Sequence, residues 1–125
     1  MKSYSVCRLL HSDENKNPRN SEGSFIHLRD GRIGFFYSRY CAESSHDHAN
    51  ADIAVIYSAD NGESWSDVFL AIESVPGDKI RAIDIQLWID PDWKLWAFWT
   101  VRDDNFRNDD PQHLSVWAMV GQPCQ

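Results

Sequence analysis

The stretch Ser58-Ala-Asp-Asn-Gly-Glu-Ser-Trp65 decides how the rest of the chain is organised. It lies between two runs rich in β-forming residues, Ile53–Tyr57 and Asp67–Ile72. An Asp-Asn-Gly sequence between two such runs predicts a β-hairpin, because Gly62 can adopt the positive φ that a tight turn requires.

The side chains of this stretch predict how the turn is held. The Asp60 carboxylate can accept hydrogen bonds from backbone N–H groups of its own turn, and the Ser58 hydroxyl can extend that network. Trp65 supplies a large apolar ring at the base of the following strand.

The composition indicates one soluble globular unit that does not bind nucleic acid. The chain has 125 residues, of which 42% are hydrophobic and 25% charged. A net charge of −7 disfavours binding to a phosphate backbone. Aromatic residues make up 13% of the chain, which favours sheets over helical bundles.

The cysteine spacing and the hydrophobic pattern argue against a zinc-binding, disulfide-rich or membrane-spanning protein. Cys7, Cys41 and Cys124 lie far apart without a C-x-x-C spacing, so we expect free thiols rather than a zinc ribbon or a disulfide framework. No apolar run approaches the roughly 20 residues of a membrane span, and the start lacks the apolar core of a signal peptide. We expect a soluble chain, cytoplasmic as it stands, with no metal or cofactor.

The hydrophobic pattern predicts short strands and no helix. The expected strands are residues 4–10, 24–28, 32–39, 52–58, 66–72, 84–89, 94–101 and 114–120. Strands joined in sequence by short turns form an antiparallel meander.

This pattern repeats along the chain. Asp30–Ser38 matches Asp92–Thr100 at an offset of 62 residues, and Leu114–Val120 falls under Asp52–Ser58 at the same offset. Repeated four-stranded meanders are typical of β-propellers, which close with about 4–8 blades. We therefore expect residues 11–72 to form one blade and 79–125 an incomplete second blade of a longer propeller. A complete seven-stranded β-sandwich is the alternative, but it would leave apolar faces uncovered.

Meander geometry predicts which loops share an end of the sheets. The turns at 30–31 and 60–62 lie at one end, while residues 11–23, 40–51, 79–84 and 102–113 lie at the other. Guanidinium and carboxylate groups together suit an anionic, hydroxyl-rich ligand, although a solvated rim of paired charges is the alternative. The charged and histidine residues of this end are Arg19, Glu22, Arg39, Glu43, His46, Asp47, His48, Arg81, Asp84, Arg102, Asp103, Asp104, Arg107, Asp109, Asp110 and His113.

Four ordered elements resemble the first blade of sialidase-like exo-glycosidases, most closely the bacterial sialidase-like or BNR-repeat branch. They are Asn17–Gly23, Leu28–Arg39, His46–His48 and Ser58–Trp65, the last resembling the Asp-box pattern S-x-D-x-G-x-x-W. The resemblance implies an all-β, six-bladed propeller and a glycoside hydrolase that acts on an anionic or sialic-acid-type terminal sugar. In the Asp-box, Ser58, Asp60, Gly62 and Trp65 would have a structural role.

The resemblance also implies roles for residues of the opposite end. Arg19 matches the arginine that grips the substrate carboxylate, and Arg39 matches an arginine that lines the same pocket. Asp47 matches the acid/base, which would protonate the leaving oxygen and then activate water. Asp52 is a second possible match but begins a strand. The tyrosine nucleophile of sialidases and two further arginines would belong to later blades, so we expect this chain alone to be inactive.

Two departures from the family pattern concern substrate choice. The family's Arg-Ile-Pro is replaced by Arg19-Asn-Ser-Glu22, so Glu22 brings a carboxylate close to the proposed carboxylate-binding arginine. His48 follows Asp47 and could contact sugar hydroxyls.

Two other interpretations stay open. A non-catalytic propeller that binds glycan or protein could carry the same Asp-box, since that hairpin serves blade packing. A metal site at His46-Asp-His48 or in the acidic loop 103–110 is weaker, because neighbouring alternating residues make poor joint ligands. Asp60–Gly62 lacks the further oxygen ligands of a calcium loop.

Overall fold

The computed structural model describes residues 12, 16–41, 45–46, 49–74 and 80–121, with only the backbone for Ile80. Every regular element in these ranges is a strand, as the absence of helical periodicity predicts. The strands are β1 (Asn20–His27), β2 (Ile33–Tyr40), β3 (Ala51–Ser58), β4 (Phe69–Ile72), β5 (Ile80–Ile89), β6 (Leu95–Asp103) and β7 (Leu114–Gly121).

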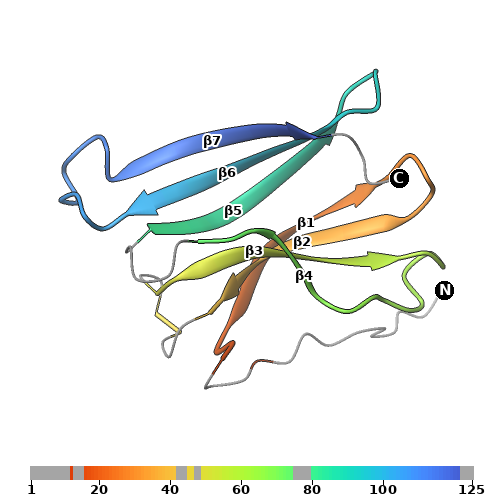
Figure 1. Ribbon diagram of the computed structural model, residues 1–125, viewed down its shortest axis with the longest axis horizontal. Helices are drawn as coiled ribbons and strands as arrows, with labels where there is room; N and C mark the ends of the chain where they lie inside the picture. The colour runs from red at the N-terminus through yellow and green to blue at the C-terminus, as the bar shows by residue number, and fades with distance from the viewer. Residues whose placement is uncertain (1–11, 13–15, 42–44, 47–48, 75–79, 122–125) are drawn as a thin grey trace, which may run out of the picture.

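The strands form two antiparallel sheets that lie one above the other (Figure 1). The first sheet has the order β1-β2-β3-β4 and the second the order β5-β6-β7, so neighbours in sequence are neighbours in space. The predicted all-β class and the meander connectivity are confirmed. The strand expected at residues 4–10 lies outside the described residues.

Three predicted strand starts are wrong by three or four residues, and three others differ by one. β1 begins at Asn20 instead of residue 24, β4 begins at Phe69 instead of 66, and β5 begins at Ile80 instead of 84. β1 and β5 extend further because each contains a bulge, between Ser21 and Gly23 and between Ile83 and Gln86, beyond which backbone pairing resumes. Backbone hydrogen bonds need no apolar side chain, so hydrophobic pattern alone does not find these extensions.

The first two strands of each sheet repeat at the predicted offset of 62. Leu28 N donates to Arg32 O at 2.8 Å, and 62 residues later Asp90 N donates to Lys94 O at 3.1 Å. Gly31 and its counterpart Trp93 both have positive φ, +90° and +62°. The two turns therefore share one backbone geometry, although Trp93 adopts a conformation that bulky residues rarely take.

The third strand repeats at 63 residues, so the predicted match of Leu114 to Asp52 is wrong by one position. Tyr40 pairs with Ala51 across the first sheet, whereas its counterpart Arg102 pairs with Leu114. One more residue separates the second pair than the first. Because side chains alternate between faces, this shift decides which residues of β7 face the first sheet.

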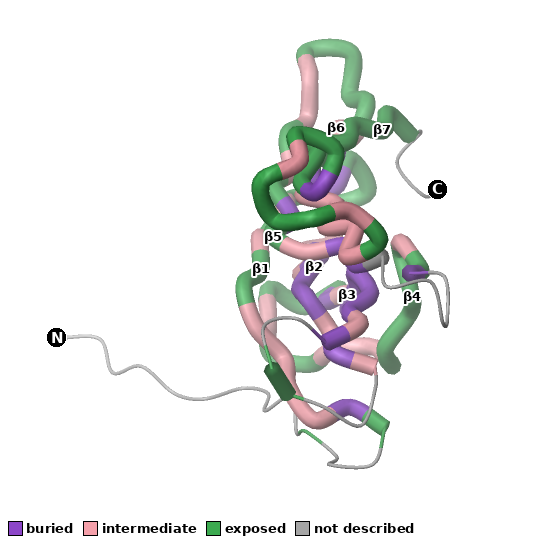
Figure 2. Tube along the Cα trace, turned by 90° about the vertical axis from the view of Figure 1, so that its left-hand side faces the viewer, coloured by how far each residue is buried: buried purple, intermediate pink, exposed green. Residues whose placement is uncertain are grey.

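The core lies between the two sheets. Phe36, Ile53 and Val55 of the first sheet pack against Ala97 and Trp99 of the second, together with Ala82 and Ile85. Figure 2 shows this burial concentrated on β2 and β3, while β7 is exposed along its length. No helix in the described residues is long and apolar enough to span a membrane.

The Ser58–Trp65 turn has the predicted hydrogen-bond network. Gly62 N donates to Ser58 Oγ at 2.8 Å, and Ser64 N donates to Asp60 Oδ1 at 2.8 Å. Gly62 has φ +91°, as predicted, and Trp65 Nε1 donates to the Gly62 carbonyl at 3.1 Å. The turn is thus held by its own side chains.

The far face of the second sheet is apolar and exposed. It carries Trp88, 53% exposed, and Val116, 76% exposed. Phe98 on this face is the counterpart of Phe36, which is only 7% exposed because it packs against the second sheet. By the same offsets Trp88 corresponds to Ile26 and Val116 to Ile53, both packed in the core. The exposed face therefore repeats the face by which the first sheet packs against the second.

We expect replacement of Asp60 by alanine to lower the thermal unfolding midpoint more than replacement of its exposed neighbour Glu63. Hydrogen bonds from Ser64, and then from Ser58, hold the pKa of Asp60 below its ordinary value of 3.8. The folded chain then binds fewer protons than the unfolded chain near that pH, so the stabilisation is present above pH 3.8 and lost as pH falls through the folded value. Thermal melts across pH, compared for D60A, E63A and the parent chain, test both statements; equal midpoints for D60A and E63A would contradict the first.

We expect the 125-residue chain to self-associate through the apolar far face of the second sheet. Replacing Phe98 and Val116 by threonine keeps strand-forming side chains while removing apolar surface. Light scattering should report a mass above the 14.5 kDa monomer for the parent chain and a value nearer the monomer for the double variant. The control is Val68→Thr. Val68 is exposed directly before β4 of the first sheet, so its replacement should leave the mass unchanged. A parent chain that is monomeric and melts sharply and reversibly would refute this expectation.

Candidate functional site

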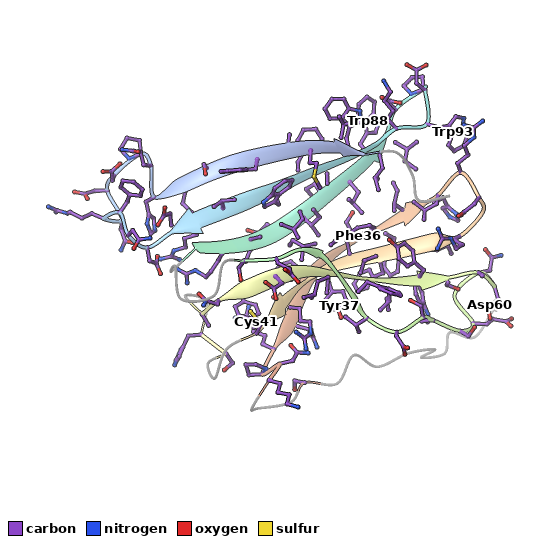
Figure 3. All side chains as sticks on the ribbon, viewed as in Figure 1. Phe36, Tyr37, Cys41, Asp60, Trp88 and Trp93 are labelled. Carbon is purple, nitrogen blue, oxygen red and sulfur yellow. The ribbon has the colours of Figure 1, made fainter. Side chains whose placement is uncertain are left out.

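The charged loops gather at one end of the two sheets. The loops after β2 and β6 lie at this end, while the hairpin turns lie at the other (Figure 1). Figure 3 shows Cys41, which begins the loop after β2, at the opposite end from Asp60. The predicted separation of the Ser58–Trp65 turn from the charged loops is therefore confirmed.

Arg19 lies directly before β1 and is positioned by the end of β2. Its backbone carbonyl accepts a hydrogen bond from Tyr40 N at 3.0 Å, and its guanidinium lies 4.7 Å from the centre of the Tyr40 ring. Nη1 of the guanidinium donates to the carbonyl of Ser45 at 3.3 Å. An arginine stacked on an aromatic ring is pre-ordered, and its side chain here is 31% exposed. Arg19 can therefore meet a ligand from solvent.

Glu22 lies in the bulge of β1 and reaches back to Arg19. The two side chains are 3.7 Å apart at their closest N and O atoms, and that of Glu22 is 48% exposed. Ser21 also donates its hydroxyl to Glu22. An exposed ion pair contributes only about 0–1 kcal/mol to the stability of the fold. A ligand carboxylate could therefore replace Glu22 as the partner of the Arg19 guanidinium.

Arg39 and Asp52 form a cross-strand pair at the ends of β2 and β3. Successive strand side chains alternate between faces, so Arg39 points away from the face that carries Tyr40 and Arg19. Asp52 is 6% exposed and accepts hydrogen bonds from Ser74 N at 2.7 Å and Ser74 Oγ at 2.8 Å. Buried and bonded in this way, Asp52 holds the chain after β4 and is a poor candidate for proton transfer.

Cys41 is the free cysteine among the described residues. Burial, and then the negative charge of Asp52, raises the pKa of its thiol. A raised pKa favours the protonated thiol, which is a weaker nucleophile than the thiolate.

Asp47 and His48 lie outside the described residues, and their neighbour His46 is exposed. The structure therefore leaves the acid/base and the His48 contact as predictions. Among the residues that are described, no three metal-ligating side chains come together.

The second sheet repeats the arginine and carboxylate of the first. The register of β5 against β6 makes Arg81 the counterpart of Arg19 and Asp84 the counterpart of Glu22, each carboxylate lying in its strand's bulge. The signal was present in the sequence as R-x-x-E and R-x-x-D, spaced by 62 residues. It becomes visible only once the bulges align the two strands.

Arg81 differs from Arg19 because it is fully buried. Its side chain is 0% exposed and forms an ion pair with Asp104, which is also bonded by Arg102 Nε at 3.2 Å. His113, 4% exposed, lies 3.9 Å from the same carboxylate. Burial lowers the pKa of Arg81, and the charge of Asp104 opposes that effect. Arg81 therefore anchors the loop after β6, and its side chain is not exposed to solvent as that of Arg19 is.

Asp84 faces the first sheet from its bulge. Its backbone has φ +57°, and its N–H donates to Ser38 Oγ at 3.3 Å. The residue as a whole is exposed. Removal of part of the water around its carboxyl, and then the negative charge of Glu22, raises the pKa of the Asp84 carboxyl. A carboxyl with a raised pKa in a strained bulge is a candidate functional group. Glu22 thus pairs with Arg19 and also acts on the charge of Asp84 across the two sheets.

We expect Asp104→Asn to destabilise the chain by at least about 2 kcal/mol, because it leaves the buried Arg81 charge without its carboxylate. Arg102→Gln, which removes a partly exposed partner of the same carboxylate, should cost less. Urea unfolding of the two variants measures the difference. The ion-pair account of loop anchoring is wrong if the two variants are equally stable.

Comparison with known proteins gives a structural likeness only. No protein-family model matches the sequence, and no curated protein matches it. Fourteen chains of solved structures match. The K499G mutant of NanB sialidase from Streptococcus pneumoniae is similar with a TM-score of 0.63 and 17% identity, over 84% of this chain and 19% of that one.

NanB sialidase from the same organism, in complex with 2-[(3-chlorobenzyl)ammonio]ethanesulfonate, is similar with a TM-score of 0.63 and 16% identity. Here the match covers 89% of this chain and 21% of that one. The chain spans about a fifth of the sialidase chains it matches. At this identity the likeness shows the fold alone: two antiparallel sheets that resemble part of a sialidase propeller domain.

Proposed function

We propose that the chain forms the N-terminal part of a sialidase-like exo-glycosidase that removes an anionic or sialic-acid-type terminal sugar. The observation that carries this proposal is Arg19, stacked on Tyr40 at the charged end of a sialidase-like fold and partly exposed to solvent. A guanidinium held in this way suits a sugar carboxylate, which it can bind through two parallel hydrogen bonds.

Glu22 competes with the substrate carboxylate for the Arg19 guanidinium. In this proposal a substrate carboxylate displaces Glu22 from Arg19, and the charge of Glu22 already raises the pKa of Asp84. The released Glu22 carboxylate can then accept hydrogen bonds from sugar hydroxyls. Arg39 points to the other face of the first sheet, away from Tyr40 and Arg19, so it takes no part in holding this carboxylate.

Asp47 carries the proton transfer in this proposal. It protonates the leaving glycosidic oxygen and later removes a proton from the attacking water, with His48 beside it contacting the sugar. Sialidases use a tyrosine nucleophile rather than a carboxylate. That tyrosine and the remaining arginines belong to further blades, so the 125-residue chain by itself does not turn over substrate.

Further blades also account for the apolar far face of the second sheet. Since this face repeats the one that packs between the two sheets, a following sheet of the same kind covers it in the complete propeller. The Asp-box of the first blade, Ser58–Trp65, then serves packing at the end away from the chemistry.

We expect the complete protein to hydrolyse aryl α-ketosides of acidic sugars, with Asp47→Asn removing most of kcat. Brønsted acid–base catalysis contributes typically 10²–10⁴-fold, which sets the expected loss. Arg19→Ala should act chiefly on KM, because it removes ground-state binding of the carboxylate. Asp52→Asn is unsuitable as a control because Asp52 is structural, so His27→Ala, exposed at the other end of β1, serves instead.

Two outcomes would contradict the enzymatic proposal. One is no turnover on any aryl glycoside of a broad panel, and the other is full turnover by Asp47→Asn. Glycan binding that survives Asp47→Asn but is lost with Arg19→Ala would identify a non-catalytic glycan-binding propeller.

A further inference from the structure

A second pocket opens between the end of β4 and the second sheet, apart from the Arg19 site. It has a volume of about 660 Å³ and is lined by residues of β4, β5, β6, β7 and the loop after β6. This volume lies within the roughly 300–1,000 Å³ of small-molecule sites. The pocket can therefore hold a ring-sized ligand.

Two tryptophans form its apolar wall. Trp99 belongs to the core, and its cross-strand partner Trp117 is 55% exposed. Their ring centres are 6.4 Å apart with planes tilted by 37°, so they make one bent surface. Trp117 Nε1 donates to Ser115 Oγ at 2.9 Å, which satisfies the indole N–H and fixes the orientation of the ring. The open ring face of Trp117 remains available for stacking.

The polar lining of the pocket includes two carboxylates, which accept hydrogen bonds, and amide and hydroxyl groups, which both donate and accept. Glu73, Asp103, Gln112 and Ser115 line it beside the aromatic wall. Arg81 also lines it, but its charge is balanced by Asp104. The pocket thus joins a flat apolar surface to a negatively charged, hydrogen-bonding edge.

We propose that this pocket is a second carbohydrate-binding site that holds a neutral pyranose ring. A pyranose presents an apolar C–H face, which stacks on Trp117, and an edge of hydroxyls, which bond to Gln112 and Glu73. The carboxylates of Glu73 and Asp103 repel an anionic sugar or a phosphate. This site is independent of the proposed hydrolysis, since it shares none of Arg19, Glu22 or Asp47.

The test is a titration of the 125-residue chain with methyl glycosides of neutral hexoses, a methyl glucuronide and indole, followed by saturation-transfer NMR and tryptophan fluorescence. The neutral glycosides should bind saturably, more tightly than the glucuronide or indole. Trp117→Ala should weaken binding by about tenfold, equivalent to about 1.4 kcal/mol. Gln112→Ala should also weaken binding of the neutral glycosides. Gln112 lies in the loop before β7, so this replacement leaves the strands intact.

Trp88→Ala is the matched control, because Trp88 is 53% exposed but lies on the far face of the second sheet (Figure 3). It should bind the neutral glycosides as the parent chain does. The proposal is overturned if no neutral glycoside binds, if the glucuronide or indole binds more tightly, or if Trp117→Ala and Gln112→Ala both bind like the parent chain.

Discussion

The packing of one sheet face on the next is the constraint on which the rest of the structure depends. Phe36, Ile53 and Val55 fit against Ala97 and Trp99, so the two sheets are locked with their turns at one end and their loops at the other. A core residue contributes about 1.5–3 kcal/mol by leaving water, so this contact outweighs any exposed ion pair at the loop end. The apolar contact aligns the sheets, and the charged site is positioned as a consequence.

The same backbone unit is used twice with different outcomes. Each sheet begins with an arginine followed three residues later by an acid in a bulge. In the first sheet the Arg19 guanidinium stacks on the uncharged ring of Tyr40, and the Arg19 side chain stays partly exposed to solvent. In the second sheet Arg102 takes the place of Tyr40 and Asp104 neutralises Arg81, which is buried. One geometry thus provides a partly exposed arginine and a buried, structural one.

The hairpins could be predicted from the sequence because their determinants are local. Asp-Asn-Gly at 60–62 and Asp-Gly at 30–31 place a carboxylate and a glycine where a tight turn needs them. The bulges and the extra residue before β7 could not be predicted, since they alter backbone pairing without a change in hydrophobic pattern. The burial of Arg81 depends on Asp104, 23 residues away, and no local signal indicates that contact. The roles of Asp47 and His48 rest on family resemblance alone.

The central claim is that Arg19, and not its counterpart Arg81, receives a sugar carboxylate. The most direct measurement is the NMR signal of the arginine side-chain Nε–H groups in the ¹⁵N-labelled chain during titration with an acidic sugar and with its methyl ester. We expect the Arg19 signal to shift saturably with the free acid and not with the ester, while the Arg81 signal stays in place. A shift of Arg19 with the ester as large as with the acid, or a response at Arg81 alone, would contradict it.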